Sequence, residues 1–180
     1  MTKRIMTTER VYTDGRRPAR LNKKKTSKYQ GDEKMKNAIL FSSEKQDWET
    51  PKKLFDKLND EFHFQTDVAA SKENSKCSNY VDSEKDALSI SWEDLGNIFC
   101  NPPYERTLQD AFIKKAYEES LKTNNKIVVL IPARTDTVRW HEHIFGKAEV
   151  RFLKGRVRFE ENGIPRKHGA TFPSALVIYN

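Results

Sequence analysis

The residues with the clearest chemical potential are Asn101-Pro102-Pro103-Tyr104, which directly follow the short apolar run 97–100. The Asn101 side-chain oxygen accepts hydrogen bonds, and two consecutive prolines stiffen the loop and leave the Pro102 carbonyl as a second acceptor. Two acceptors on one exocyclic NH2 group would make its nitrogen nucleophilic, while Tyr104 stacks on the attached ring. The motif therefore favours methyl transfer to an amino group of a planar substrate, and the alternative is an ordinary turn between a strand and a helix.

Elements that could position this motif begin just upstream of it. A helix is predicted shortly after residue 48, with Thr50 as its N-cap and Pro51 at the first helical position, where the missing N–H costs nothing. Its buried stripe recurs at helical spacing and consists of Leu54, Phe55, Leu58 and Phe62. The alternating residues 62–66 then predict a strand that ends at Asp67.

The rest of the chain alternates between strands and helices. A second strand over 97–100 is followed by a helix from about 108 to 121, a buried strand over 127–131 and a helix that Thr135 caps and Gly146 terminates. Two β-rich stretches, 149–159 and 175–179, are joined by the polar loop 160–169. This order predicts an α/β fold with a mostly parallel sheet and an antiparallel edge hairpin. Ligands of such sheets bind beyond the carboxyl ends of the strands, where Asp67 and Asn101 both lie.

Length and charge indicate one folded domain with a basic arm. A chain of 180 residues has room for one α/β domain. Its net charge of +7 is concentrated in residues 1–40, which hold twelve Lys or Arg against four acidic residues; the remaining residues carry 21 basic and 22 acidic groups. We expect residues 1–40 to be disordered and to attract phosphate backbones, or else to serve only as a solvated tail, and we place the domain at 41–180.

Composition also limits the cellular setting. No apolar run is long enough for a membrane span, and no signal-peptide pattern is present, so we expect a cytoplasmic protein. The two cysteines, Cys77 and Cys100, suggest a reducing compartment. Neither they nor the four scattered histidines have the spacing of metal ligands, and we expect no metal site.

From Trp48 to its end, the chain resembles the phage-type DNA N6-adenine methyltransferases, the phage Dam-like family within the S-adenosylmethionine-dependent class I fold, which is Rossmann-like. The resemblance rests on the order and spacing of several short segments. These are Trp48-Glu49-Thr50-Pro51 with Leu54-Phe55, Asp67-Val68-Ala69-Ala70, the run 74–80, Asp86-Ala87-Leu88, Asn101 to Tyr104, the run 131–137, the run 155–159 and Phe172-Pro173-Ser174-Ala175.

The resemblance implies transfer of a methyl group from S-adenosylmethionine to N6 of a flipped adenine in DNA, by a phage or prophage protein in a bacterial cell. The implied catalytic residues are Asn101, Pro102, Pro103 and Tyr104. The implied cofactor-binding residues are Trp48, Thr50, Pro51, Asp67, Ala69, Ala70, Asp86 and Asn101, with Asp86 at the adenine end and Asp82 as a candidate for the ribose. The sequence departs from the class in two ways. The glycine-rich signature of the class is absent. Residues 71–96 are also too few for two complete strand-helix units, so we expect a sheet that is reduced between the first and fourth strands of the class.

Contacts with DNA must come from local basic residues, because the domain is nearly neutral. The candidates are Tyr104, Arg134, Lys154, Arg156, Arg158, Lys167 and His168, with Arg166 beside them. A solvated hairpin face is an alternative for Arg158 and Arg166. Two other functions also remain open at this point: N-methylation of RNA or of a glutamine amide in a protein, and a non-catalytic DNA-binding relic of the fold.

Overall fold

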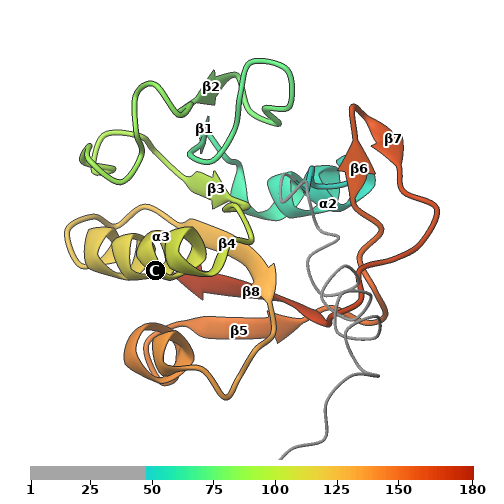
Figure 1. The fold of residues 1–180 in the computed structure, drawn as a ribbon. Helices are drawn as coiled ribbons and strands as arrows, with labels where there is room; N and C mark the ends of the chain where they lie inside the picture. The colour runs from blue at the N-terminus through green and yellow to red at the C-terminus, as the bar shows by residue number, and fades with distance from the viewer. Residues whose placement is uncertain (1–47) are drawn as a thin grey trace, which may run out of the picture. The chain divides into compact units, whose positions relative to one another are not determined.

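A computed structural model describes residues 48–180, so the predicted basic arm and the boundary near Phe41 lie outside the described residues. Figure 1 shows the helices and strands of this region. They are α2 (Lys52–Phe62), β1 (Thr66–Asp67), β2 (Asn79–Tyr80), β3 (Ile98–Cys100), α3 (Arg106–Ser120), β4 (Ile127–Pro132), the π-helix η1 (Trp140–Ile144), β5 (Glu149–Phe152), β6 (Glu160–Glu161), β7 (Ile164–Pro165) and β8 (Ser174–Tyr179).

Six of the strands form one sheet in the order β2-β1-β3-β4-β8-β5. The strands β2, β1, β3 and β4 are parallel, whereas β8 is antiparallel to both β4 and β5. This arrangement confirms the predicted α/β fold with a mostly parallel sheet and an antiparallel edge, and it is consistent with a Rossmann-like methyltransferase fold. Between β1 and β3 the chain forms only the two-residue β2 and no helix, so this part of the sheet is reduced, as expected.

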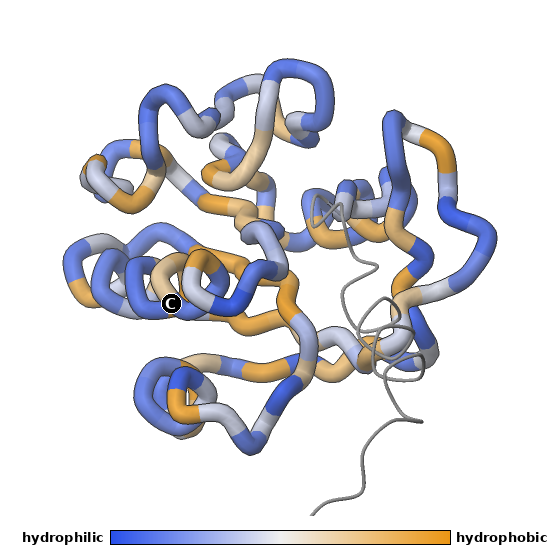
Figure 2. Tube along the Cα trace, in the orientation of Figure 1, coloured by the Kyte–Doolittle hydropathy of each residue, from blue (hydrophilic) through white to orange (hydrophobic). Residues whose placement is uncertain are grey.

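The two faces of the sheet pack against different helices. Alternate residues of β4 and β8 belong to separate apolar clusters: Ile127, Val129 and Ile131 pack with α3 and η1, whereas Val128 and Leu130 pack with α2. Figure 2 shows the apolar residues concentrated in β4 and β8 at the centre of the sheet. A strand that is buried on both faces reads as a continuous apolar run, which explains why β4 could be predicted from sequence.

The N-terminus of α2 differs from the prediction. Thr50 is not the N-cap; Pro51 occupies that position, and its carbonyl accepts the first helical hydrogen bonds from the amides of Leu54 and Phe55. The Lys52 amide donates instead to the carboxylate of Glu160, at 3.1 Å. The predicted stripe is confirmed for Phe55, Leu58 and Phe62, which are buried, whereas Leu54 is only partly buried.

The predicted strand over 62–66 is also wrong in its first part. The helix continues to Phe62, and His63 closes it in the left-handed conformation with φ of 49°, so that the strand begins only at Thr66. Near the C-terminus, β5 ends at Phe152 rather than at residue 159, and the expected loop contains the small hairpin β6–β7. Thr135 does not cap η1, because the carbonyl of Thr137 accepts the first helical hydrogen bonds from Trp140 and His141.

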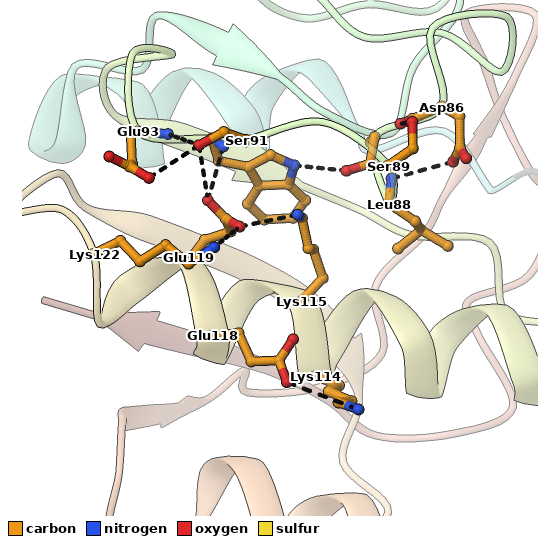
Figure 3. A network of polar contacts seen from close by, with 12 residues as sticks. Asp86, Leu88, Ser89, Ser91, Glu93, Lys114, Lys115, Glu118, Glu119 and Lys122 are labelled. Atoms are coloured by element: carbon orange, nitrogen blue, oxygen red, sulfur yellow. Dashed lines mark hydrogen bonds and ion pairs between the residues drawn. The ribbon is translucent and has the colours of Figure 1, made fainter.

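A polar network holds the segment between β2 and β3 against α3 (Figure 3). The carboxylate of Glu119 is buried, accepts from the Trp92 amide at 2.8 Å, and forms ion pairs with Lys115 at 2.9 Å and Lys122 at 2.8 Å. Burial acts to raise the pKa of Glu119, but the hydrogen bonds from Lys122, the Trp92 amide and Lys115 outweigh it and lower this pKa to about 2. The Trp92 indole in turn donates to the Ala87 carbonyl at 2.8 Å, so the network fixes the backbone beside Asp86.

Candidate active site

The parallel pairing of β1 and β3 brings the two predicted strand ends together. Thr66 pairs with Ile98 and Asp67 with Phe99, so that Asp67 and Asn101 lie at the same edge of the sheet. Two cavities adjoin there and have Ala69, Asn74 and Pro103 in common. Together they form one crevice at the carboxyl ends of the strands, where α/β sheets bind ligands.

The smaller cavity is polar and has a volume of about 50 Å³. Its lining residues are Trp48, Glu49, Thr50, Asp67, Ala69, Asn74, Lys76, Asn101, Pro102 and Pro103. The Asn101 amide nitrogen donates to the Trp48 carbonyl, which fixes the orientation of the side chain. Its Oδ1 atom is buried and has no hydrogen-bond partner among residues 48–180. Because a buried polar atom without a partner is costly, this acceptor is a specific feature of the cavity that needs an explanation.

Pro102 and Tyr104, which belong to the same motif as Asn101, differ in their surroundings. Pro102 is buried, and its carbonyl receives no hydrogen bond within residues 48–180. The Tyr104 ring lies in an aromatic cluster, nearly parallel to Trp48 at a centroid distance of 6.3 Å and edge-on to Phe159 and Phe172 at 5.7 and 5.4 Å. Its hydroxyl is buried without a partner, and burial raises the pKa of Tyr104 well above its usual range, so the hydroxyl stays protonated.

Asp67 supplies a buried carboxyl group to the same cavity. Its two oxygens accept from the amides of Ala69 and Lys76, each at 3.3 Å, and thereby fold the loop after β1. Burial raises the pKa of Asp67 to about 6, although both amide hydrogen bonds and the Lys76 ammonium act to lower it. This carboxyl group is therefore easily protonated below neutral pH, and a cationic ligand would stabilise its charged form.

The larger cavity has a volume of about 420 Å³ and is mostly apolar. Its lining residues are Val68, Ala69, Ala70, Ser71, Asn74, Val81, Asp82, Ser83, Asp86, Ala87, Leu88, Pro103, Leu108 and Phe112. Asp86 has a φ of 48° and accepts from the Leu88 amide at 3.1 Å. An apolar cavity of this size with a few carboxylates is typical of small-molecule sites.

Most of the predicted cofactor residues line one of these cavities. Trp48, Thr50, Asp67 and Asn101 line the smaller one, Ala70 and Asp86 line the larger one, and Ala69 lines both. Asp82 also lines the larger cavity, whereas Pro51 lines neither. Sequence reasoning missed Asn74 and Lys76. Both belong to the run 74–80, which carried part of the family resemblance but had no assigned role. No group of three or more potential metal ligands was found within residues 48–180.

Tyr104, one of the predicted DNA-binding residues, lies in the aromatic cluster, and the basic candidates fall into two groups. Lys154, Arg156, Arg158, Arg166, Lys167 and His168 are exposed and flank the β6–β7 hairpin, whereas Arg134 is exposed separately after β4. Backbone bonds from Ala170 to Val157 at 2.8 Å and from Arg166 to Phe159 at 2.9 Å hold the two arms together. The approach is so close that a Cβ atom on Gly169 would lie 2.8 Å from the Cβ atom of Arg156.

The arms of this hairpin contact the small cavity through Trp48. The Arg166 guanidinium lies 4.4 Å from the centroid of the Trp48 ring, a cation–π contact. The carboxylate of Glu49 accepts from the amides of Asn162 and Gly163, at 2.9 and 3.1 Å, in the turn between β6 and β7. Trp48 and Glu49, which line the small cavity containing the unpartnered Asn101 Oδ1, therefore also contact the basic hairpin.

Comparisons with known proteins show the family of the chain. A family model described as DNA N-6-adenine-methyltransferase (Dam) matches residues 37–180. A DNA N-6-adenine-methyltransferase of Escherichia phage T1 is 31% identical over 117 residues, which are 64% of this chain and 48% of that protein. A DNA N-6-adenine-methyltransferase of Haemophilus phage HP1 (strain HP1c1) is 28% identical over 126 residues, 67% of this chain and 69% of that protein. The chain thus matches about half the length of the first relative. Within residues 48–180, no helix is long and apolar enough to cross a membrane.

Proposed function

Because this chain belongs to the DNA N-6-adenine-methyltransferase (Dam) family, we propose that it transfers a methyl group from S-adenosylmethionine to N6 of adenine in DNA. The observation that carries the proposal is the buried Oδ1 atom of Asn101, which has no partner within residues 48–180. The Trp48 carbonyl occupies the amide nitrogen of Asn101, so the side chain presents an acceptor rather than a donor. An exocyclic amino group supplies the hydrogen that this acceptor lacks.

The crevice fits the proposed methyl donor. The smaller cavity offers a carboxyl group at Asp67 and an ammonium group at Lys76, which suit the charged amino-acid end of S-adenosylmethionine. The larger cavity offers apolar walls for the nucleoside, with Asp82 and Asp86 as acceptors for its hydroxyl and amino groups. In this assignment Asp67 faces the ligand's ammonium group. When bound, S-adenosylmethionine supplies a methyl group on a positively charged sulfur.

The protein's contribution to the reaction is mainly positioning. Asn101 Oδ1 and the Pro102 carbonyl accept the two hydrogens of the adenine amino group and orient its nitrogen toward the methyl group. Such preorganised acceptors need no rearrangement during the reaction, and one of them typically contributes about 10²–10³ in rate. In this assignment Asp67 and Lys76, two titratable residues in the lining of the smaller cavity, face the ligand's charged groups. The proposed role of the site is therefore orientation of the nucleophile, and the surplus proton of the methylated amino group is released to water.

A base inside a duplex cannot reach this crevice, and we propose that the target adenine is flipped out, at a cost of a few kcal/mol. Stacking on Tyr104 would recover about 1–3 kcal/mol of that cost. The Tyr104 ring already contacts Trp48, Phe159 and Phe172.

The exposed basic residues beside the hairpin are the proposed DNA contacts. Arg156, Arg158, Lys167 and His168 lie on the two arms, close to the Arg166 that stacks on Trp48. Phosphate contacts from these arms would hold the duplex near Asn101, because backbone contacts fix register and orientation. Lys154 and Arg134 extend the proposed contact surface.

The test is a methyl-transfer assay with labelled S-adenosylmethionine and the full chain. DNA, RNA and a protein containing accessible glutamines are offered separately, and the product bases are sequenced for N6-methyladenine. The proposal predicts label in DNA at adenine N6. Label in RNA or protein alone would show that DNA is not the substrate. Tight binding of DNA without binding of S-adenosylmethionine in calorimetry would identify a non-catalytic relic of the fold.

A further inference from the structure

Lys76 is an unassigned cation in the wall of the smaller cavity. It lies between β1 and β2, and its backbone amide donates to Asp67 Oδ2 at 3.3 Å. Its ammonium group is 3.6 Å from Glu160 Oε2, and the two side chains are only 16% and 11% exposed. Asp67 therefore fixes the backbone of Lys76, and Glu160 in the hairpin strand β6 holds its side chain at the cavity.

The hydrogen-bonding capacity of this ammonium group is unused. No hydrogen bond joins Lys76 Nζ to any of residues 48–180, because the contact with Glu160 is an ion pair beyond hydrogen-bonding distance. An ammonium group has three donors, and within residues 48–180 no acceptor forms a hydrogen bond with those of Lys76, although its side chain keeps some contact with solvent. The wall of the cavity therefore contains a positive charge whose donors are available to a ligand, as is the unpartnered Oδ1 of Asn101.

The charged residues around the cavity indicate that an anionic group of a ligand would bind at Lys76. Among residues 48–180, Lys76 is the one basic residue that lines the smaller cavity. The carboxylate of Glu49 is engaged by the amides of Asn162 and Gly163, and Glu160 Oε1 is engaged by the Lys52 amide. The Asp67 oxygens also accept amide hydrogen bonds, but these are longer, at 3.3 Å. We therefore assign Asp67 to the cation of a ligand and Lys76 to its anion.

We propose that Lys76 binds the carboxylate of the amino-acid end of S-adenosylmethionine, with Glu160 as the residue that positions it. This inference rests on the proposed function and names a determinant of cofactor specificity. A carboxylate supplies the acceptors that the ammonium group lacks, and charge-assisted hydrogen bonds of this kind are about twice as strong as neutral ones. Asp67 and Lys76 then pair with the opposite charges of one zwitterion.

The competing role for Lys76 is structural. Its ion pair with Glu160 joins the loop after β1 to the hairpin, and loss of that link would weaken any ligand of the crevice. The two roles differ in ligand dependence. A carboxylate-binding lysine affects only ligands that carry the carboxylate, whereas a structural lysine affects all of them alike.

The test is calorimetric binding of two ligands to the full chain: S-adenosylhomocysteine, and its analogue that lacks only the carboxyl group. We expect Lys76→Ala to weaken S-adenosylhomocysteine about 10- to 100-fold and to leave the analogue within about twofold. Lys76→Arg should retain most of the discrimination. Lys114→Ala is the matched control, because Lys114 forms an exposed ion pair with Glu118 away from both cavities, and it should change neither ligand.

The outcomes separate this inference from the proposed function. If the native chain binds neither ligand, the proposed cofactor is wrong. If the native chain binds S-adenosylhomocysteine but Lys76→Ala weakens both ligands equally, Lys76 is structural and the inference is overturned. Circular dichroism reports whether Lys76→Ala folds. If it does not fold, Lys76→Met, which keeps the aliphatic stem, replaces it in the same comparison.

Discussion

Acidification should weaken binding of S-adenosylmethionine through Asp67. Burial raises the pKa of this carboxyl group to about 6, so it loses its charge between neutral and mildly acidic pH. In the proposed site the charged form faces the ammonium group of the ligand, which favours the carboxylate. Binding then releases a proton, and affinity should rise with pH through about pH 6.

The size of this effect follows from the ionised fraction. With a pKa of about 6, Asp67 is about nine-tenths ionised at about pH 7 and about one-tenth ionised at about pH 5. If the ligand binds only to the ionised form, affinity falls about tenfold over this interval. The stability of the protein without ligand should depend on pH in the opposite direction to the affinity. A raised pKa favours the protonated form in the folded state, so the free energy of unfolding decreases as pH rises from 3.8 through about 6.

The assay is isothermal titration of S-adenosylmethionine at several pH values, with Asp67→Asn as the control. The variant keeps the size of the side chain, and its affinity should vary less than about twofold over the same range, whatever its absolute value. No histidine of the described part of the chain lines either cavity, so titration of histidine elsewhere should appear equally in both proteins. An equal pH dependence in the native and variant chains would refute the role assigned to Asp67.

Four further outcomes are expected. Glu119→Gln should reduce the free energy of unfolding by about 1–3 kcal/mol in urea titrations. The pKa of Glu119 is about 2 in the folded chain against 4.5 ordinarily, so the stabilisation that the Glu119 carboxylate gives the native chain should be lost as pH falls from 4.5 toward 2. Arg156→Ala should weaken binding to all DNA sequences alike and reduce the salt slope by about 0.9, whereas Arg151→Ala, which breaks ion pairs with Glu61 and Glu149, should leave DNA binding unchanged. Deleting residues 1–40, which hold twelve basic residues, should flatten the dependence of DNA affinity on salt without altering the modified sites; an unchanged slope would favour a passive tail. Tyr104→Ala should lower the affinity for DNA with an unpaired target adenine by about 1–3 kcal/mol, measured by fluorescence anisotropy.

The parts of the fold that repeat a local pattern could be predicted from sequence. The continuous apolar run of β4 and the helical stripe of α2 each reflect burial against the sheet core, and their periods are visible in the chain itself. The N-terminus of α2 could not be predicted in the same way. The group that accepts from its first amide is Glu160, which is 108 residues away, so local capping rules pointed to Thr50 instead.

In the candidate site, too, some features could be predicted from the sequence and others could not. Asp67 and Asn101 could be expected to meet, because both follow strands of a parallel sheet. The role of Lys76 depends on a contact with Glu160 from the opposite end of the chain, and no spacing in the sequence indicates it. The aromatic packing of Tyr104 against Trp48, Phe159 and Phe172 likewise joins three distant segments.

The most direct test of the central claim is single-turnover methyl transfer by Asn101→Ala with saturating DNA and labelled S-adenosylmethionine. The buried Oδ1 atom of Asn101 is the acceptor assigned to the adenine amino group, and its loss should slow methyl transfer by about 10²–10³. Calorimetric affinity for S-adenosylhomocysteine should remain within a few fold, and Asn101→Asp, which keeps an acceptor oxygen, should be less impaired. Methyl transfer to adenine N6 at the native rate in Asn101→Ala would contradict the assignment of this site.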